Sequence, residues 1–168
     1  MAFVTSTSTL DRDYQDNQSA IRKHLNAHAE FLGAIRLPSG AFEKIAETDV
    51  TTDIIFLRKR AKKVTEDKAT WLEIGAAPAE IRQDTLQYKP MPINAYYAAH
   101  PEMVVGKLDW VSNGYERVPG VKYSGTDFEA DLTTAVFKLP EGGYKERAKQ
   151  SATAAKEPVR IPAPEFVK

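Results

Sequence analysis

The chain has 168 residues, of which 42% are hydrophobic and 27% charged, ordinary values for a globular protein. Basic and acidic residues both number 23, so no overall charge draws the chain to nucleic acid or membrane, and any DNA contact has to be local. The absence of cysteine excludes disulfides and thiolate zinc sites, and no apolar run approaches the ~18 residues of a membrane span, so we expect a cytoplasmic protein without a membrane partner.

A buried strand is predicted at residues 1–5, with no turn or cap before it. A domain seldom begins inside a central strand, which favours a truncated domain. A helix is then predicted from Asp16 or Asn17 to about Glu30. One stripe at helical spacing consists of Ile21, Leu25, His28 and Leu32 and is expected to face the core. The residues off this stripe, Arg22, Lys23 and Asn26, are expected to face water.

Two further strands are predicted at residues 33–37 and 50–57, separated by a turn at Pro38. The second is rich in β-branched residues, and its continuous apolar core suggests burial on both faces, as in an α/β sheet. Residues 58–63 follow it with five positive charges in six positions. Arg36 is a charge inside an apolar strand; it lies at an edge, or it pairs with Asp53 or Glu43.

The remainder of the chain has weaker patterns. Residues 64–92 are predicted to be an irregular connection anchored by Trp71, and a short helix follows at 93–99. A hairpin is expected within 110–123 around Asn113-Gly114. A last helix is predicted at 126–138, with Thr126 as its cap and Glu129 completing a capping box. The predicted organisation is 1–63 as an α/β unit, 64–144 as an irregular and helical appendage, and 145–168 as a disordered tail.

The residues that fill this pattern resemble a known family. They are Phe3-Val4-Thr5-Ser6, Asp11, Ile21-Arg22-Lys23-His24-Leu25, Gly33-Ala34-Ile35-Arg36-Leu37-Pro38, Phe42 and the run from Thr48 to Arg60, followed by Ile93–Tyr97, His100–Gly106 and Leu139–Tyr144. The series resembles the downstream half of N-6 adenine DNA methyltransferases of the type I modification-subunit kind. It is most similar to the methylase regions of large phage and plasmid proteins that also carry a helicase. The resemblance implies an incomplete Rossmann-like methyltransferase sheet, its last three strands, with a helical and irregular C-terminal appendage.

In the complete family domain, S-adenosylmethionine donates a methyl group to an adenine rotated out of the duplex. The chain departs from this family at both reactive sites. No two glycines are spaced as Gly-x-Gly, and no two of the ten prolines are adjacent, so the donor-binding turn and the (Asp/Asn)-Pro-Pro-aromatic tetrad are missing. We therefore assign no catalytic and no cofactor-binding residue, and expect the chain to be inactive alone. It could also be a non-enzymatic DNA-binding or interaction module, or one half of a split methyltransferase.

DNA is the expected partner, with the missing N-terminal half or a helicase domain as further candidates. The candidate nucleic-acid residues are Phe42, Arg58, Lys59, Arg60, Lys62 and Lys63. Clustered Lys and Arg bind phosphates because they release counterions, although the same run also fits a solvated strand end. Phe42 either stacks on a base or packs in the core. His24 and His28 have the i, i+4 spacing of two zinc ligands but lack an acidic partner, so no metal site is assigned.

Overall fold

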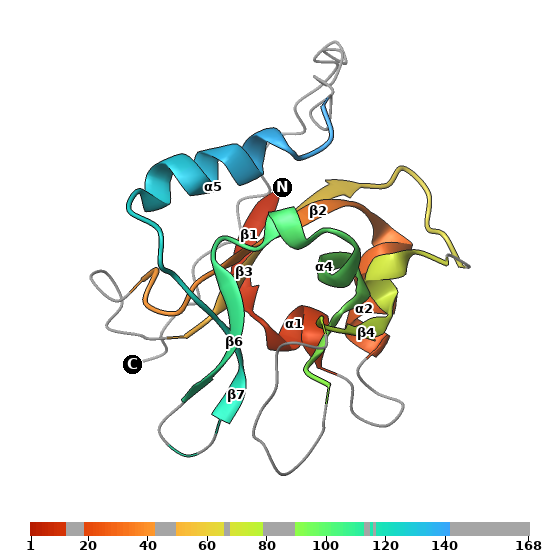
Figure 1. Ribbon diagram of the computed structural model, residues 1–168. Helices are drawn as coiled ribbons and strands as arrows, with labels where there is room; N and C mark the ends of the chain where they lie inside the picture. Colours follow the sequence, from red (N-terminus) through yellow and green to blue (C-terminus); the bar gives the residue numbers. More distant parts are fainter. Residues whose placement is uncertain are drawn as a thin grey trace, which may run out of the picture.

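The computed structural model describes residues 1–12, 19–42, 50–65, 68–78, 90–112, 115 and 117–141. This part of the chain is a mixed α/β structure with small antiparallel sheets and short helices around them (Figure 1). Its strands are β1 (Ala2–Ser6), β2 (Ala29–Leu37), β3 (Thr52–Lys59), β4 (Ile74–Ala76), β5 (Pro92–Asn94), β6 (Lys107–Ser112) and β7 (Arg117–Lys122). Its α-helices are α1 (Ser8–Asp11), α2 (Ser19–His28), α4 (Ala95–Ala99) and α5 (Phe128–Phe137), and its 3₁₀ helices are η1 (Thr70–Leu72) and η2 (Pro101–Met103).

The largest sheet has the strand order β1-β3-β2, and β3 is antiparallel to both of its neighbours. β1 and β2 therefore run parallel to each other. The chain reaches β2 from β1 through α1 and α2, the kind of helical crossover that a parallel pair requires. The three strands predicted at residues 1–5, 33–37 and 50–57 are all present, and the expectation of a protein that mixes α-helices and β-strands is confirmed.

β1 is a partly exposed edge strand, so the prediction of a buried strand at residues 1–5 is wrong. Only β3 pairs with it among the described residues, and its side chains alternate between exposed and half-buried. Val4 is 52% exposed. The apolar run at residues 1–5 correctly indicates a strand, but an apolar run does not specify how many neighbours the strand has.

The junction between α2 and β2 differs from the predicted boundary. The helix ends at His28, and β2 begins at the next residue, so Leu32 belongs to the strand and not to the helical stripe. The register against β3 shifts between Phe31 and Gly33. Gly33 has a φ of 140°, and a Cβ at this position would lie 2.6 Å from Cδ2 of Leu139. Only glycine fits this backbone and this space without strain.

α2 is rotated from its predicted orientation, although Leu25 of the apolar stripe still packs against the core and Lys23 is exposed as expected. Arg22 and Asn26 are 1% and 4% exposed, whereas Ile21 in the apolar stripe is 58% exposed. The Arg22 guanidinium lies inside the protein because it donates to the carbonyl oxygens of Leu10 at 2.8 Å and Leu72 at 3.1 Å. The expectation that Arg22 and Asn26 face water is therefore wrong.

The later elements follow the predicted outline with shifted boundaries. β5 occupies the first residues of the predicted helix, and α4 begins after it with Asn94 as its N-cap. β6 and β7 form the predicted hairpin, whose turn at Asn113-Gly114 lies outside the described residues. The N-cap of α5 is Asp127, whose side chain accepts from the Ala130 amide, in place of the predicted Thr126. The predicted caps Asp16 and Asn17 and the tail at 145–168 also lie outside the described residues.

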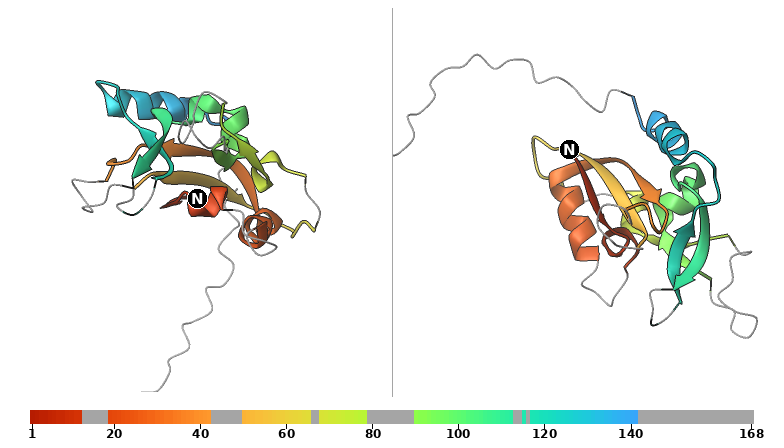
Figure 2. Two further views of the ribbon diagram at one scale, coloured as in Figure 1. Left: turned by 60° about the horizontal axis from the view of Figure 1, so that its bottom comes forward. Right: turned by 90° about the vertical axis from the view of Figure 1, so that its left-hand side faces the viewer.

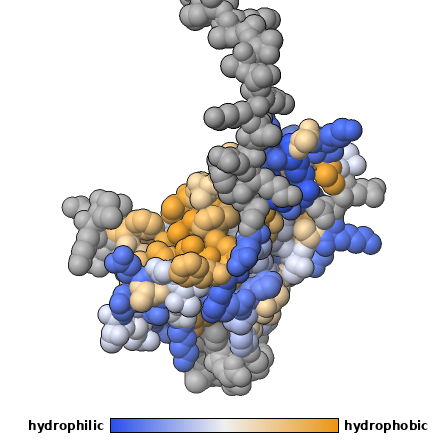
Figure 3. Space-filling model, turned by 90° about the horizontal axis from the view of Figure 1, so that it is seen from above, coloured by the Kyte–Doolittle hydropathy of each residue, from blue (hydrophilic) through white to orange (hydrophobic). Residues whose placement is uncertain are grey.

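Figure 2 shows how the elements surround the large sheet: α1 and α2 lie on the side opposite α5. Buried apolar side chains from the sheet, η1, β5 and α4 form one core, which contains Ile35, Ile55, Trp71, Ile93 and Tyr97. Seen from above, apolar side chains also gather on one outer face of the molecule, beside hydrophilic ones (Figure 3).

Candidate nucleic-acid interface

The structure separates the candidate residues into two places. Arg58 and Lys59 end β3, and residues 60–63 continue from that end. Phe42 follows β2 at the other end of the sheet, near the start of β3, because Leu37 is opposite Thr52 while Ala29 is opposite Lys59. Seven residue steps at ~3.3 Å put the two ends roughly 23 Å apart. Phe42 and the basic run therefore do not form one site.

Phe42 is half-buried and packs against the hydrophobic core. Its end of the sheet is joined to β7, because the Ser39 amide donates to the Val121 carbonyl at 2.9 Å and the Val121 amide donates to the Thr51 hydroxyl at 3.1 Å. These contacts fit the core interpretation of Phe42.

In the basic run, the two arginines are held by the protein and the three lysines are exposed. Arg58 donates to the Glu30 carboxylate through Nη2 at 2.6 Å and Nε at 2.9 Å. Arg60 donates through Nε to the Asn26 carbonyl at 3.0 Å. The guanidinium groups thus fix the end of the strand, while Lys59, Lys62 and Lys63 extend their charges into solvent.

Two lysines from other parts of the chain join this surface. A cavity of about 340 Å³ between α2 and the segment after β3 is lined by Lys23 and Lys68. Its wall is held together by the Val64 amide, which donates to the Ala27 carbonyl at 3.0 Å. We define the basic end as Lys23, Lys59, Lys62, Lys63 and Lys68, all of them exposed. The sequence places Lys23 on the solvent side of its helix, but nothing in it brings Lys23 or Lys68 next to the run.

A neighbouring cavity of about 300 Å³ has aromatic walls. Phe31 and Trp71 stack there with ring centroids 4.6 Å apart, and Tyr96 meets Phe31 edge-on at 5.0 Å. Arg60 lines the same cavity, and Asn26 lines both cavities. The basic end therefore borders an aromatic cluster, and surfaces that bind single nucleic-acid strands combine these two features.

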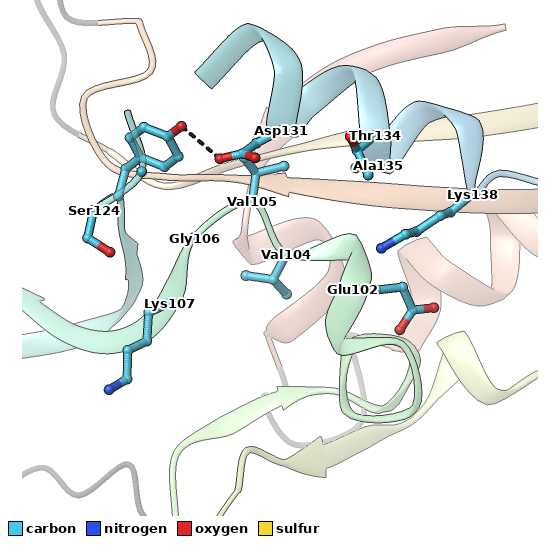
Figure 4. A pocket seen from close by; sticks show the side chains of 12 residues that line it. Glu102, Val104, Val105, Gly106, Lys107, Ser124, Asp131, Thr134, Ala135 and Lys138 are labelled. Carbon is cyan, nitrogen blue, oxygen red and sulfur yellow. Dashed lines mark hydrogen bonds between the residues drawn. The ribbon is translucent and has the colours of Figure 1, made fainter. Parts of the chain in front are cut away.

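A third cavity, of about 470 Å³, lies between α5 and the segments around η2 and β7 (Figure 4). The Tyr123 hydroxyl donates to the Asp131 carboxylate at 2.8 Å across its rim. Desolvation, this hydrogen bond and the nearby carboxylates raise the pKa of Tyr123 to about 12. The cavity carries charges of both signs, including Glu102 and Lys138, and none of the candidate residues lines it.

A buried ionic cluster lies near the ends of β1 and β2 where α/β sheets often bind ligands. Arg36 donates to both carboxylate oxygens of Asp53, at 2.8 and 2.9 Å, and to Asp11 at 2.6 Å. Tyr97 donates to Asp53 at 2.9 Å and packs beneath the Arg36 guanidinium. Pairing of Arg36 with Asp53, one of the alternatives considered for this charge, is confirmed.

This cluster is structural because it is closed to solvent and its groups are satisfied. Asp53 is 0% exposed and Arg36 and Tyr97 are each 1% exposed. Burial raises the pKa of Asp53 and the Arg36 charge opposes that rise; burial and the Asp53 charge raise the pKa of Tyr97 well above its ordinary value. Asn94 completes the arrangement, since its backbone N–H donates to the Asp11 carboxylate at 2.9 Å.

Other site chemistry is limited in the described part of the chain. The rings of His24 and His28 lie tilted against each other with centroids 4.4 Å apart, and the described residues contain no group of three or more His, Cys, Asp or Glu that could hold a metal ion. Within the same residues, no helix is both long and apolar enough to cross a membrane.

The fold and these surfaces define a mixed α/β protein with a basic end beside an aromatic cavity. No protein-family model, no curated protein and no solved structure matches the chain.

Proposed function

We propose that this chain is a DNA-binding module derived from the target-side half of an N-6 adenine DNA methyltransferase domain. The observation that carries the DNA-binding role is the basic end. Five exposed lysines from α2, β3 and the segment after β3 share one end of a chain that carries no net charge overall. A cytoplasmic setting, where DNA is accessible, belongs to this proposal.

The arrangement of the large sheet supports the proposed ancestry. The resemblance implies that the last two strands form an antiparallel edge, and β2 and β3 are antiparallel. It also implies a helix that crosses back from the preceding strand, and α2 lies between β1 and β2 in the chain. The part of the sequence that resembles the family most densely, residues 31–60, covers β2 and β3. A Rossmann-like methyltransferase sheet completed by other strands is therefore our proposed origin for this unit.

The lysines are proposed to contact phosphates rather than bases. An ammonium group on a flexible stem binds phosphate as a point charge, and each phosphate contact releases condensed counterions. Binding should then be insensitive to sequence and steeply dependent on salt. Phe31 and Tyr96, which are half-buried in the cavity beside Arg60, offer ring surface on which an unpaired base can stack, so single-stranded DNA should compete with duplex.

The test is fluorescence anisotropy of a labelled duplex, titrated with the chain at several salt concentrations. Neutralising three lysines of the basic end should weaken binding at least about tenfold at low salt and make the log–log salt slope less negative by up to about 2.7. The matched control removes three exposed lysines elsewhere. The two triple variants are Lys59→Gln/Lys62→Gln/Lys63→Gln and Lys107→Gln/Lys122→Gln/Lys138→Gln.

Equal weakening in both variants would show that the chain responds to net charge alone, and no binding at low salt would overturn the proposal. The same preparation serves for a calorimetric titration with S-adenosylmethionine. We propose that the chain does not bind this donor by itself, since its sequence lacks the glycine-rich turn. Binding at micromolar strength would contradict the proposed inactive module.

A further inference from the structure

The outer edge of β1 carries backbone groups that β3 does not use. The Met1 amino group donates to the Leu57 carbonyl at 2.9 Å, and the Leu57 amide donates back to the Met1 carbonyl at 2.9 Å. Hydrogen-bonded residues alternate along an antiparallel pair, so Phe3 and Thr5 also direct their amides and carbonyls toward β3. It follows that Ala2, Val4 and Ser6 direct theirs toward the open edge.

This edge lacks the features that keep other edge strands apart. Edge strands of monomeric proteins carry charged side chains, proline or bulges, or they lie beneath another element. β1 has the sequence Ala-Phe-Val-Thr-Ser, without charge or proline, and its register with β3 is continuous from Ala2 to Ser6. Among the described elements, only β3 pairs with it. The strand is therefore open to pairing.

The opposite edge of the same sheet is different. There the Val105 amide donates to the Arg36 carbonyl at 2.9 Å, and Val104 bridges Arg36 in a parallel direction. The outer side of β2 is thus partly occupied by the chain itself. An edge that pairs with the same edge of a second copy is used up in both molecules, so such association gives a closed dimer and not a fibre.

We propose that β1 pairs with β1 of a second copy of this chain, antiparallel and about a two-fold axis through Val4. This register places Val4 opposite Val4 of the partner subunit and Ala2 opposite Ser6 of the partner subunit. Each of the three outward residues in each copy donates one bond, so about six hydrogen bonds cross the axis. The two large sheets become one continuous sheet.

Self-pairing fits β1 because the strand is complementary to itself. No residue of β1 is charged, so the antiparallel register brings no like charges together. The central pair joins two β-branched side chains, a combination that stabilises antiparallel strands. Val4, half-exposed in the single chain, is covered in the pair.

The experiment is sedimentation equilibrium of the full chain from low to high micromolar concentration. The expected mass is twice 18.7 kDa at the upper end. Val4→Pro removes the amide at the axis without touching the ladder to β3, and proline is tolerated on edge strands, so this variant should sediment as a monomer. Val4→Lys should do the same. Phe137→Lys, at an 82% exposed position of α5, is the control and should remain dimeric.

A cysteine variant tests the register itself. The chain has no cysteine, so Val4→Cys adds a single thiol. Directly opposite residues of a hydrogen-bonded pair have Cα atoms ~5.5 Å apart, which a disulfide can span. Mild oxidation should convert Val4→Cys to a covalent dimer, while Phe137→Cys should remain largely monomeric. This variant also decides the question if circular dichroism shows that Val4→Pro does not fold.

A wild-type chain that is monomeric at the highest concentration overturns the proposal and leaves the edge to a strand of a different protein. Dimers that persist in Val4→Lys, with no cross-link in Val4→Cys, also overturn it, because they place the interface elsewhere. The readout contains no DNA, so its failure and the failure of the DNA-binding proposal are distinguishable.

Discussion

Arg36 holds a positive charge in the interior of the protein, where an unpaired ion is strongly disfavoured. Each nitrogen of its guanidinium donates to Asp53 or Asp11, and Tyr97 covers one of its faces. A charge inside an apolar strand predicts a buried partner of opposite charge. Asp53 is one of the candidates that the sequence offers. Tyr97 and Asp11 could not be found in this way, because their positions depend on the packing of α4 and α1 against the sheet.

Replacing Asp53 by Asn should destabilise the chain by about 3–5 kcal/mol, since it leaves a buried guanidinium without its bidentate partner. Asp109→Asn is the matched control. Asp109 pairs with Lys122 at 2.7 Å on the surface, and its loss should cost less than about 1 kcal/mol. Urea unfolding measures both variants. Similar small losses would show that the buried cluster does not hold the fold together.

At the scale of the element, α2 shows what a helical pattern does and does not specify. A repeat at helical spacing identifies which residues share a face, but it does not say which face the protein covers. Here the covering elements offer the Leu10 and Leu72 carbonyls, which an arginine can satisfy and an isoleucine cannot. Arg22 is therefore inside and Ile21 outside. These carbonyls belong to α1 and η1, 12 and 50 residues away from Arg22 in the sequence, so the orientation was not predictable from periodicity.

Two adjacent substitutions test this orientation. Arg22→Met should cost at least about 2 kcal/mol, because it removes a buried charged donor and leaves carbonyl oxygens unsatisfied. Ile21→Lys, one residue earlier, should change the free energy of unfolding by no more than about 0.5 kcal/mol. Chemical denaturation under identical conditions gives both values. The reverse order of effects would mean that the apolar stripe faces inward after all.

For the whole molecule, the basic end was only partly predictable. The run from Arg58 to Lys63 is visible in the sequence, and its three lysines are exposed. Lys23 and Lys68 join it through the contact of Val64 with Ala27, which no local pattern reveals. Phe42 is a candidate because the family resemblance implies a base-stacking aromatic residue in this region. The length of β3 places Phe42 and the run at opposite ends of the sheet.

The contacts between early and late residues predict that the described part of the chain unfolds as one unit. The Asn94 side chain donates to the Leu10 and Trp71 carbonyls, and thereby connects α1, η1 and α4. Fluorescence of Trp71 and Trp110, each isolated by replacing the other with Phe, should give transitions that coincide with circular dichroism. Two separated transitions would instead divide the chain into independent units.

The packing of the residues after α5 against the large sheet depends on the glycine at position 33. Leu139 follows α5 and occupies the space that any side chain at position 33 would need, and the Tyr96 hydroxyl lies only 3.0 Å from the same point. A methyl group at position 33 would clash with Leu139 and would push the residues after α5 away from the sheet. The seating of the last described helix thus depends on the absence of a single carbon atom about one hundred residues earlier in the chain.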